Sequence, residues 1–169
     1  MSQFSEIQND KSRLAQGIYH ATRLQGLLFF PIWAAMAALA KPLLTLVYTS
    51  EVGQAYHVFV IICYNTMFYV LGLGLVTLFY ATGRPAVSRT ASFVRLVALL
   101  IFIVPFVRAW QINGAALAGL ISSAVWVIYD LYIVRKKYGM AILPYLYALA
   151  PGIVISAILF FSIRLVVGF

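Results

Sequence analysis

Two ionisable residues, Arg95 and Asp130, stand inside long apolar stretches of the sequence. A charged side chain at mid-bilayer costs roughly 2.5–3.5 kcal/mol on insertion scales, so such residues are usually functional or paired. Arg95 follows residue 86 by about nine positions, or roughly 14 Å of helix. Its guanidinium could attract an anionic substrate group, with Asp130 close enough for a salt bridge that tunes it. Alternatively, Arg95 extends to the lipid headgroups and Asp130 pairs with Arg135 or Lys136.

Asn65 is the other polar candidate within an apolar stretch. Helical spacing places it on one face with Tyr69, Gly72 and Val76. An amide there can bond a substrate hydroxyl or a neighbouring helix, and packing between helices is the commoner role.

Catalytic signals are missing from the sequence. It has no nucleophile elbow, no GxxxxGK[ST] phosphate loop and no HExxH pair, and it has only four acidic residues. His20 and His57 have no ligand partner at metal spacing, and Cys63 is the single cysteine. We therefore predict that the chain is not an enzyme and needs no metal and no cofactor.

Composition predicts an all-α integral membrane protein. Of the 169 residues, 64% are hydrophobic and 9% are charged, whereas soluble domains carry about a quarter charged residues. A hydrocarbon core about 30 Å thick needs roughly 20 apolar helical residues. Five stretches satisfy this requirement, and we predict membrane spans near 24–48, 54–82, 86–107, 114–134 and 143–167. Pro31 and Pro42 predict a bend or an end within the first of them.

Residues 1–23 are more polar, but Phe4, Ile7, Leu14 and Ile18 recur at helical spacing. This pattern predicts either a helix lying in the cytoplasmic interface or a solvated helix that leads into the first span. We treat residues 1–23 as a cytoplasmic interfacial segment and 24–169 as one membrane domain.

The net charge of +8 indicates orientation rather than nucleic-acid binding, because the basic residues lie between apolar spans and form no stripe with aromatics. Cytoplasmic loops hold the excess of lysine and arginine. Nine basic residues fall on one side of the predicted spans and three on the other, which are Lys41, Arg108 and Arg164. We therefore expect a multi-pass protein of the cell membrane, in contact with membrane lipid, with a cytoplasmic N-terminus.

Four motifs in order carry a family resemblance. An arginine opens a span with an early proline (Arg23 to Pro31), and AKPLLTLVYTSEVGQAY (40–56), FYATGRPA (79–86) and INGAALAGLIS (112–122) follow. This order resembles the C-terminal lobe of polysaccharide or lipid-linked oligosaccharide exporters, in the multidrug/oligosaccharidyl-lipid/polysaccharide flippase superfamily. The chain would correspond to about the ninth to thirteenth of up to fourteen spans.

The resemblance implies a two-lobed flippase that moves lipid-linked sugars by alternating access. Basic cavity residues would then counter the phosphate or pyrophosphate of the substrate, with Arg95 as the first candidate and Arg23 and Arg84 near the entrance. No N-terminal lobe precedes these motifs, so we expect a fragment, one half of a split transporter or a remnant. A drug or cation exporter of the same superfamily, using Asp130 for coupling, and a non-transporting scaffold or assembly partner remain as alternatives.

Overall fold

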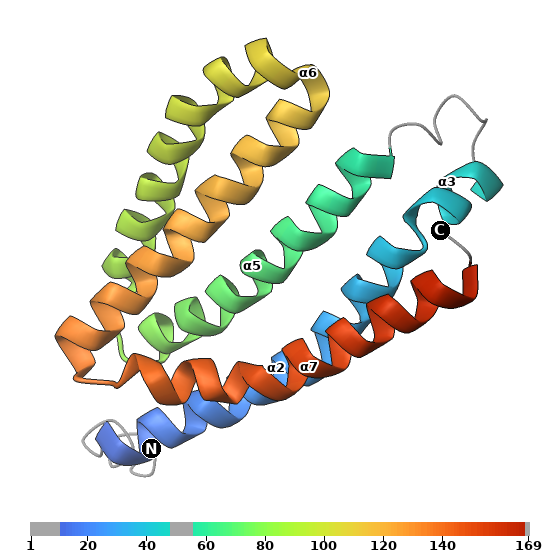
Figure 1. The fold of residues 1–169 in the computed structure, drawn as a ribbon. Helices are drawn as coiled ribbons and strands as arrows, with labels where there is room; N and C mark the ends of the chain where they lie inside the picture. Colours follow the sequence, from blue (N-terminus) through green and yellow to red (C-terminus); the bar gives the residue numbers. More distant parts are fainter. Residues whose placement is uncertain (1–10, 48–55, 168–169) are drawn as a thin grey trace.

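The computed structural model describes residues 11–47 and 56–167, and every element within these ranges is an α-helix (Figure 1). The predicted all-α class is therefore confirmed. Residues 1–10 and 48–55, which include the end of the first predicted span and the start of the second, lie outside the described residues. The helices are α2 (Lys11–Ala38), α3 (Ala40–Val47), α5 (Tyr56–Ala81), α6 (Pro85–Tyr138) and α7 (Ile142–Val167).

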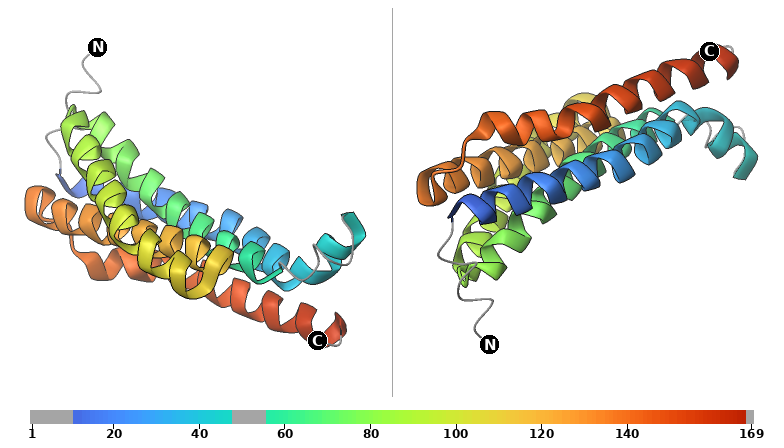
Figure 2. Two further views of the ribbon diagram at one scale, coloured as in Figure 1. Left: turned by 90° about the horizontal axis from the view of Figure 1, so that it is seen from above. Right: turned by 90° about the horizontal axis from the view of Figure 1, so that it is seen from below.

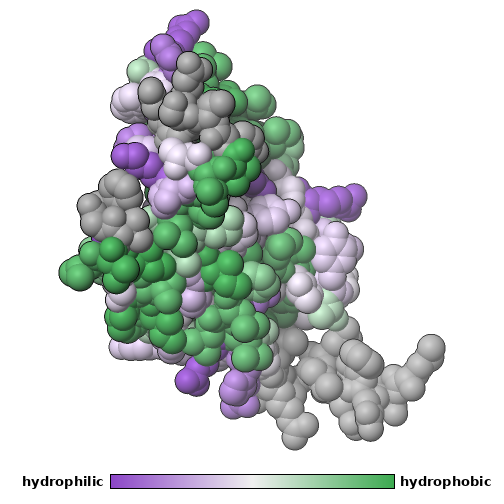
Figure 3. Space-filling view, turned by 90° about the vertical axis from the view of Figure 1, so that its right-hand side faces the viewer, coloured by the Kyte–Doolittle hydropathy of each residue, from purple (hydrophilic) through white to green (hydrophobic). Residues whose placement is uncertain are grey.

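Three of these helices, α5, α6 and α7, are long and apolar enough to cross a membrane. The most apolar stretches of the three have mean hydropathies of 2.0, 2.3 and 2.2, yet less than a quarter of each stretch is buried inside the bundle. Large apolar side chains such as Leu100, Ile128 and Phe161 are more than 60% exposed. Figure 3 shows hydrophobic residues over a broad area of one face, with hydrophilic residues mostly toward its margins. Such a surface suits lipid rather than water.

The predicted first span contains a sharp bend. Helices α2 and α3 meet at an angle of 67° around Leu39 and together could form one broken span. Pro42 lies in the first turn of α3, and proline lacks the amide hydrogen that would bond the carbonyl four residues earlier. The amides of Leu39 and Leu43 still bond Ala35 and Leu39. Pro31 lies inside α2 without interrupting it.

Helix α6 has 54 residues, about 81 Å if it were straight, which is more than twice the thickness of a bilayer core. It is interrupted at Gln111, where φ is 50° and ψ is −124°. Figure 1 shows the chain turning back there, so that the first limb (85–110) and the second limb (112–138) run beside each other. The limbs overlap the third and fourth predicted spans, whose membrane boundaries remain a prediction.

Residues 11–23 do not form a separate element. They are the first turns of α2, which continues without a break to Ala38. The described part of the interfacial segment and the start of the first predicted span are thus one helix.

The helices pack chiefly in two pairs, α2 with α7 and α5 with α6, and the pairs meet where α2 contacts α5. Figure 2 shows α2 and α7 side by side and parallel. Their backbones approach closely at Gly26 and Gly152, where a Cβ on Gly152 would lie 2.5 Å from the Gly26 carbonyl oxygen. Glycine at 152 permits this approach, as small residues commonly do between membrane helices.

Most of the basic residues gather at one end of the bundle, with Lys41, Arg108 and Arg164 as the exceptions. The start of α2, the turn at 82–84 and the link at 139–141 lie together at this end in Figure 1. Arg135, Lys136 and Lys137 form the last turn of α6, where cations interact favourably with the helix dipole, and Gly139 ends the helix in a left-handed conformation. A cytoplasmic position for this end remains a prediction.

Candidate functional site

Arg95 lies in an open groove between α5 and the two limbs of α6. The groove has a volume of about 340 Å³. Tyr69, Leu73 and Val76 line it from α5, Ser88, Ser92, Arg95, Leu96 and Leu99 from the first limb, and Trp126 from the second. Its polar side chains therefore come mainly from one stripe of the first limb, at positions 88, 92 and 95.

Two aromatic rings hold the Arg95 guanidinium. Its central carbon lies 5.1 Å from the centroid of the Tyr69 ring and 5.2 Å from that of Trp126. The two rings are themselves 5.6 Å apart and tilted by 48°. Cation–π contacts of this kind orient a guanidinium while leaving its N–H donors available.

The expected salt bridge between Arg95 and Asp130 does not form, and Asp130 does not pair with Arg135 or Lys136 either. The Asp130 side chain is 0% exposed, and neither carboxylate oxygen has a hydrogen-bond partner. Trp126, one helical turn before Asp130, contacts Arg95 instead. The first limb brings Arg95 to the level of Trp126, whereas Asp130 lies further along the second limb.

Asp130 lies near buried polar residues of two other helices. It lies within electrostatic range of Tyr145 on α7, whose side chain also interacts with Thr22 on α2. Tyr145 is 3% exposed and Thr22 is 2% exposed. The arrangement places Asp130 in the interior of the bundle and away from the Arg95 groove.

Asn65 lies outside the Arg95 groove, although Tyr69 and Val76 from the same predicted face line it. Its side chain faces Gly119 on the second limb of α6, with Nδ2 3.8 Å from the position of a Cβ there. Its Oδ1 is buried without a hydrogen-bond partner. This position suits a role in packing α5 against α6.

The other two predicted arginines do not join Arg95. Arg84 is exposed in the turn before α6, with its guanidinium 5.7 Å from the centroid of the Tyr138 ring. The Tyr138 hydroxyl also shares a 2.6 Å hydrogen bond with Thr82. Arg23 is exposed on α2 and lines a second groove, between α2 and α7. The three arginines therefore occupy three separate places.

Residues 1–57 match a family model described as "Polysaccharide biosynthesis protein". No curated protein and no solved structure matches the chain. The matched segment contains α2, α3 and the first two residues of α5. It includes Arg23 but none of the residues that line the Arg95 groove.

Sequence reasoning did not single out Ser88, Ser92 or Trp126 as site residues. The signal for the serines was present, because positions 88, 92 and 95 repeat at helical spacing on the limb that carries Arg95. Trp126 gave no such signal, because its place in the groove depends on how the second limb is rotated against α5. Within residues 11–47 and 56–167, no group of three or more His, Cys, Asp or Glu side chains could hold a metal ion.

Proposed function

We propose that this chain is the C-terminal portion of a flippase that translocates lipid-linked oligosaccharide or polysaccharide precursors, and that it is a transporter rather than an enzyme. The observation that carries the proposal is Arg95, a cation in an open groove of a membrane helix hairpin with no acidic partner among the described residues. The family match over residues 1–57 supports a role in polysaccharide biosynthesis.

The groove suits a phosphate or pyrophosphate linked to a sugar. A guanidinium binds phosphate oxygens through two parallel N–H bonds, and it is more weakly hydrated than an ammonium. The hydroxyls of Ser88, Ser92 and Tyr69 line the same groove and supply further donors and acceptors for phosphate and sugar hydroxyls.

Alternating access requires a second wall for the substrate cavity, opposite the one that this chain provides. In transporters built from two lobes, the substrate site lies between the lobes, which rock about it. The Arg95 groove would form one wall of that cavity, and a second lobe would supply the other. The second lobe and the lipid-linked sugar are thus the proposed partners.

Binding can be tested with Trp126 as the reporter. We would change Trp33 and Trp110 to phenylalanine, place the full chain in lipid nanodiscs and titrate a polyprenyl pyrophosphate. The expected result is a saturable change in Trp126 fluorescence that Arg95→Gln weakens at least tenfold. Arg89→Gln is the matched control, because Arg89 is an exposed arginine on the same limb and does not line the groove. Equal binding by the wild type and Arg95→Gln would refute the assignment of Arg95.

Transport itself needs a separate measurement. The chain would be reconstituted in proteoliposomes with a candidate second lobe and a fluorescent polyprenyl-pyrophosphate disaccharide. We expect the fluorophore to become accessible to external dithionite only when both lobes are present. Substrate binding without any exchange between leaflets would favour the non-transporting scaffold.

The fully buried, unpartnered carboxylate of Asp130 favours a second candidate, a drug or cation exporter. A carboxylate inside a membrane bundle can bind a proton or a cation. If this candidate is correct, the same proteoliposomes should export ethidium, and Asp130→Asn should abolish that export while Arg95→Gln leaves it intact.

A further inference from the structure

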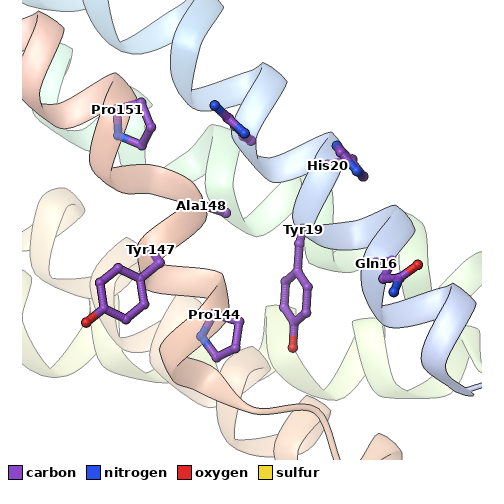
Figure 4. Close-up of a pocket in the computed structure, with 8 residues that line it drawn as sticks. Gln16, Tyr19, His20, Pro144, Tyr147, Ala148 and Pro151 are labelled. Atoms are coloured by element: carbon purple, nitrogen blue, oxygen red, sulfur yellow. The ribbon is translucent and has the colours of Figure 1, made fainter.

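A second polar groove opens between α2 and α7, at the basic end of the bundle. Its volume is about 680 Å³, and Figure 4 shows Gln16, Tyr19 and His20 on one side with Pro144 and Tyr147 on the other. The Tyr19 hydroxyl donates a 3.1 Å hydrogen bond to the Ala141 carbonyl oxygen near one end of the groove. Toward the other end, α2 and α7 converge at Gly26 and Gly152.

The donors in this groove suit an anion. Gln16, His20 and Arg23 follow one another at helical spacing on α2, and all are exposed. Tyr147, which is 70% exposed, adds a hydroxyl. Among the residues that the structure describes, no carboxylate lines the groove. An arginine, an amide and an imidazole N–H therefore face the same space, and each can donate to a phosphate oxygen.

The helix faces that form the groove become apolar beyond it. On α2, Leu27 and Pro31 continue the stripe that contains Arg23. On α7, Val154 and Ile158 continue the stripe that contains Pro151, and they are 56% and 62% exposed. A ligand with a phosphate at one end and hydrocarbon at the other would match both regions at once.

We propose that the groove between α2 and α7 binds the phosphate headgroup of an anionic bilayer phospholipid, whose acyl chains lie along the apolar continuation of the same faces. Basic pockets between membrane helices near an anionic leaflet commonly hold such headgroups. The groove is separate from the one that contains Arg95, so this inference does not depend on the proposed transport function. A bound lipid would bridge the two helices where their backbones diverge.

Native mass spectrometry of the full chain in non-ionic detergent tests the proposal. Delipidated protein would be mixed with dioleoyl phosphatidylglycerol or with dioleoyl phosphatidylcholine. We expect retention of phosphatidylglycerol in preference to phosphatidylcholine, and a loss of affinity of about fivefold or more in the double variant His20→Gln/Arg23→Gln. Arg89→Gln, which leaves this groove intact, should bind phosphatidylglycerol as the wild type does.

Three outcomes would overturn the proposal. The first is unchanged phosphatidylglycerol binding by the double variant. The second is competition by inorganic phosphate at the same concentration as the lipid, which would identify a site for a free anion. The third is Arg23-dependent binding of polyprenyl pyrophosphate but not of phosphatidylglycerol, which would assign the groove to a lipid-linked substrate. Arg23→Lys is the control for loss of binding through misfolding. It keeps the positive charge, so it should retain most of the phosphatidylglycerol binding.

Discussion

The indole ring of Trp126 lies directly over Gly72, where a Cβ would come within 2.6 Å of it. Any side chain at position 72 must therefore displace the Trp126 ring from its place against α5. We predict that Gly72→Ala destabilises the protein by roughly 1–3 kcal/mol, as overpacking generally does. The decrease in the apparent unfolding temperature in detergent, relative to the wild type, measures this loss of stability.

Gly74→Ala is the matched control for Gly72→Ala, because it makes the same change on the same helix. A Cβ on Gly74 would meet only the end of the Gln25 side chain, at 2.6 Å, and that side chain can move. We expect a much smaller loss of stability. Equal losses in the two variants would contradict the role given to Trp126.

The crossing of α2 and α7 predicts an asymmetry between its two glycines. A Cβ on Gly152 would lie 2.5 Å from a backbone oxygen of α2, whereas a Cβ on Gly26 would make an ordinary 3.5 Å contact with Leu149. Gly152→Ala should therefore reduce the free energy of unfolding by roughly 1–3 kcal/mol and lower the apparent unfolding temperature. Gly26→Ala should hardly change either quantity. The reverse order would show that the helices cross elsewhere.

The bend of α6 holds a non-glycine residue at positive φ. Gln111 has φ 50°, a conformation that strains most side chains. We predict that Gln111→Gly stabilises the hairpin by roughly 1 kcal/mol. Ile112→Gly, one residue later in helical conformation, should instead cost roughly 1 kcal/mol. Thermal unfolding of both variants in the same detergent gives the comparison, and a loss of stability in Gln111→Gly would count against the bend.

The buried carboxylate of Asp130 has no hydrogen-bond partner in the described structure. A neutral amide of nearly the same shape removes the cost of burying an unpaired charge. Asp130→Asn should therefore leave stability at pH 8 unchanged or raise it by up to roughly 2 kcal/mol. Ser123→Ala, which removes another buried and unpartnered oxygen, should also be harmless. Marked destabilisation by Asp130→Asn would instead indicate a bound cation.

The sequence predicted where the helices lie along the chain better than it predicted which side of each helix packs against which neighbour. Apolar runs long enough to span a bilayer, with Pro42 inside the first run and a gap at 108–113 between the third and fourth, were sufficient for the all-α class and for breaks near Leu39 and Gln111. These features depend on local properties of the chain, namely hydropathy, length and the backbone chemistry of proline and glycine.

Neither pairing considered for Asp130, with Arg95 or with Arg135 or Lys136, is present, and the reason is physical. Depth along neighbouring helices can be counted from sequence, but rotation about each helix axis is set by packing. The fit of Trp126 over Gly72 turns Trp126 toward Arg95, and Asp130 is buried near Tyr145 instead. The same limitation led to Arg23 being grouped with Arg95, although Arg23 faces the groove shared with α7.

The pairing of α2 with α7 joins the first and last described helices, which are separated by more than 100 residues of chain. Helices α5 and α6 can associate as soon as both have left the ribosome, because their contacts are local in sequence. The face of α2 that contains Gly26 stays uncovered until α7 has been synthesised. Cotranslational assembly of the bundle is therefore expected to finish late, and α2 is the segment for which an insertase or chaperone would be needed during that interval.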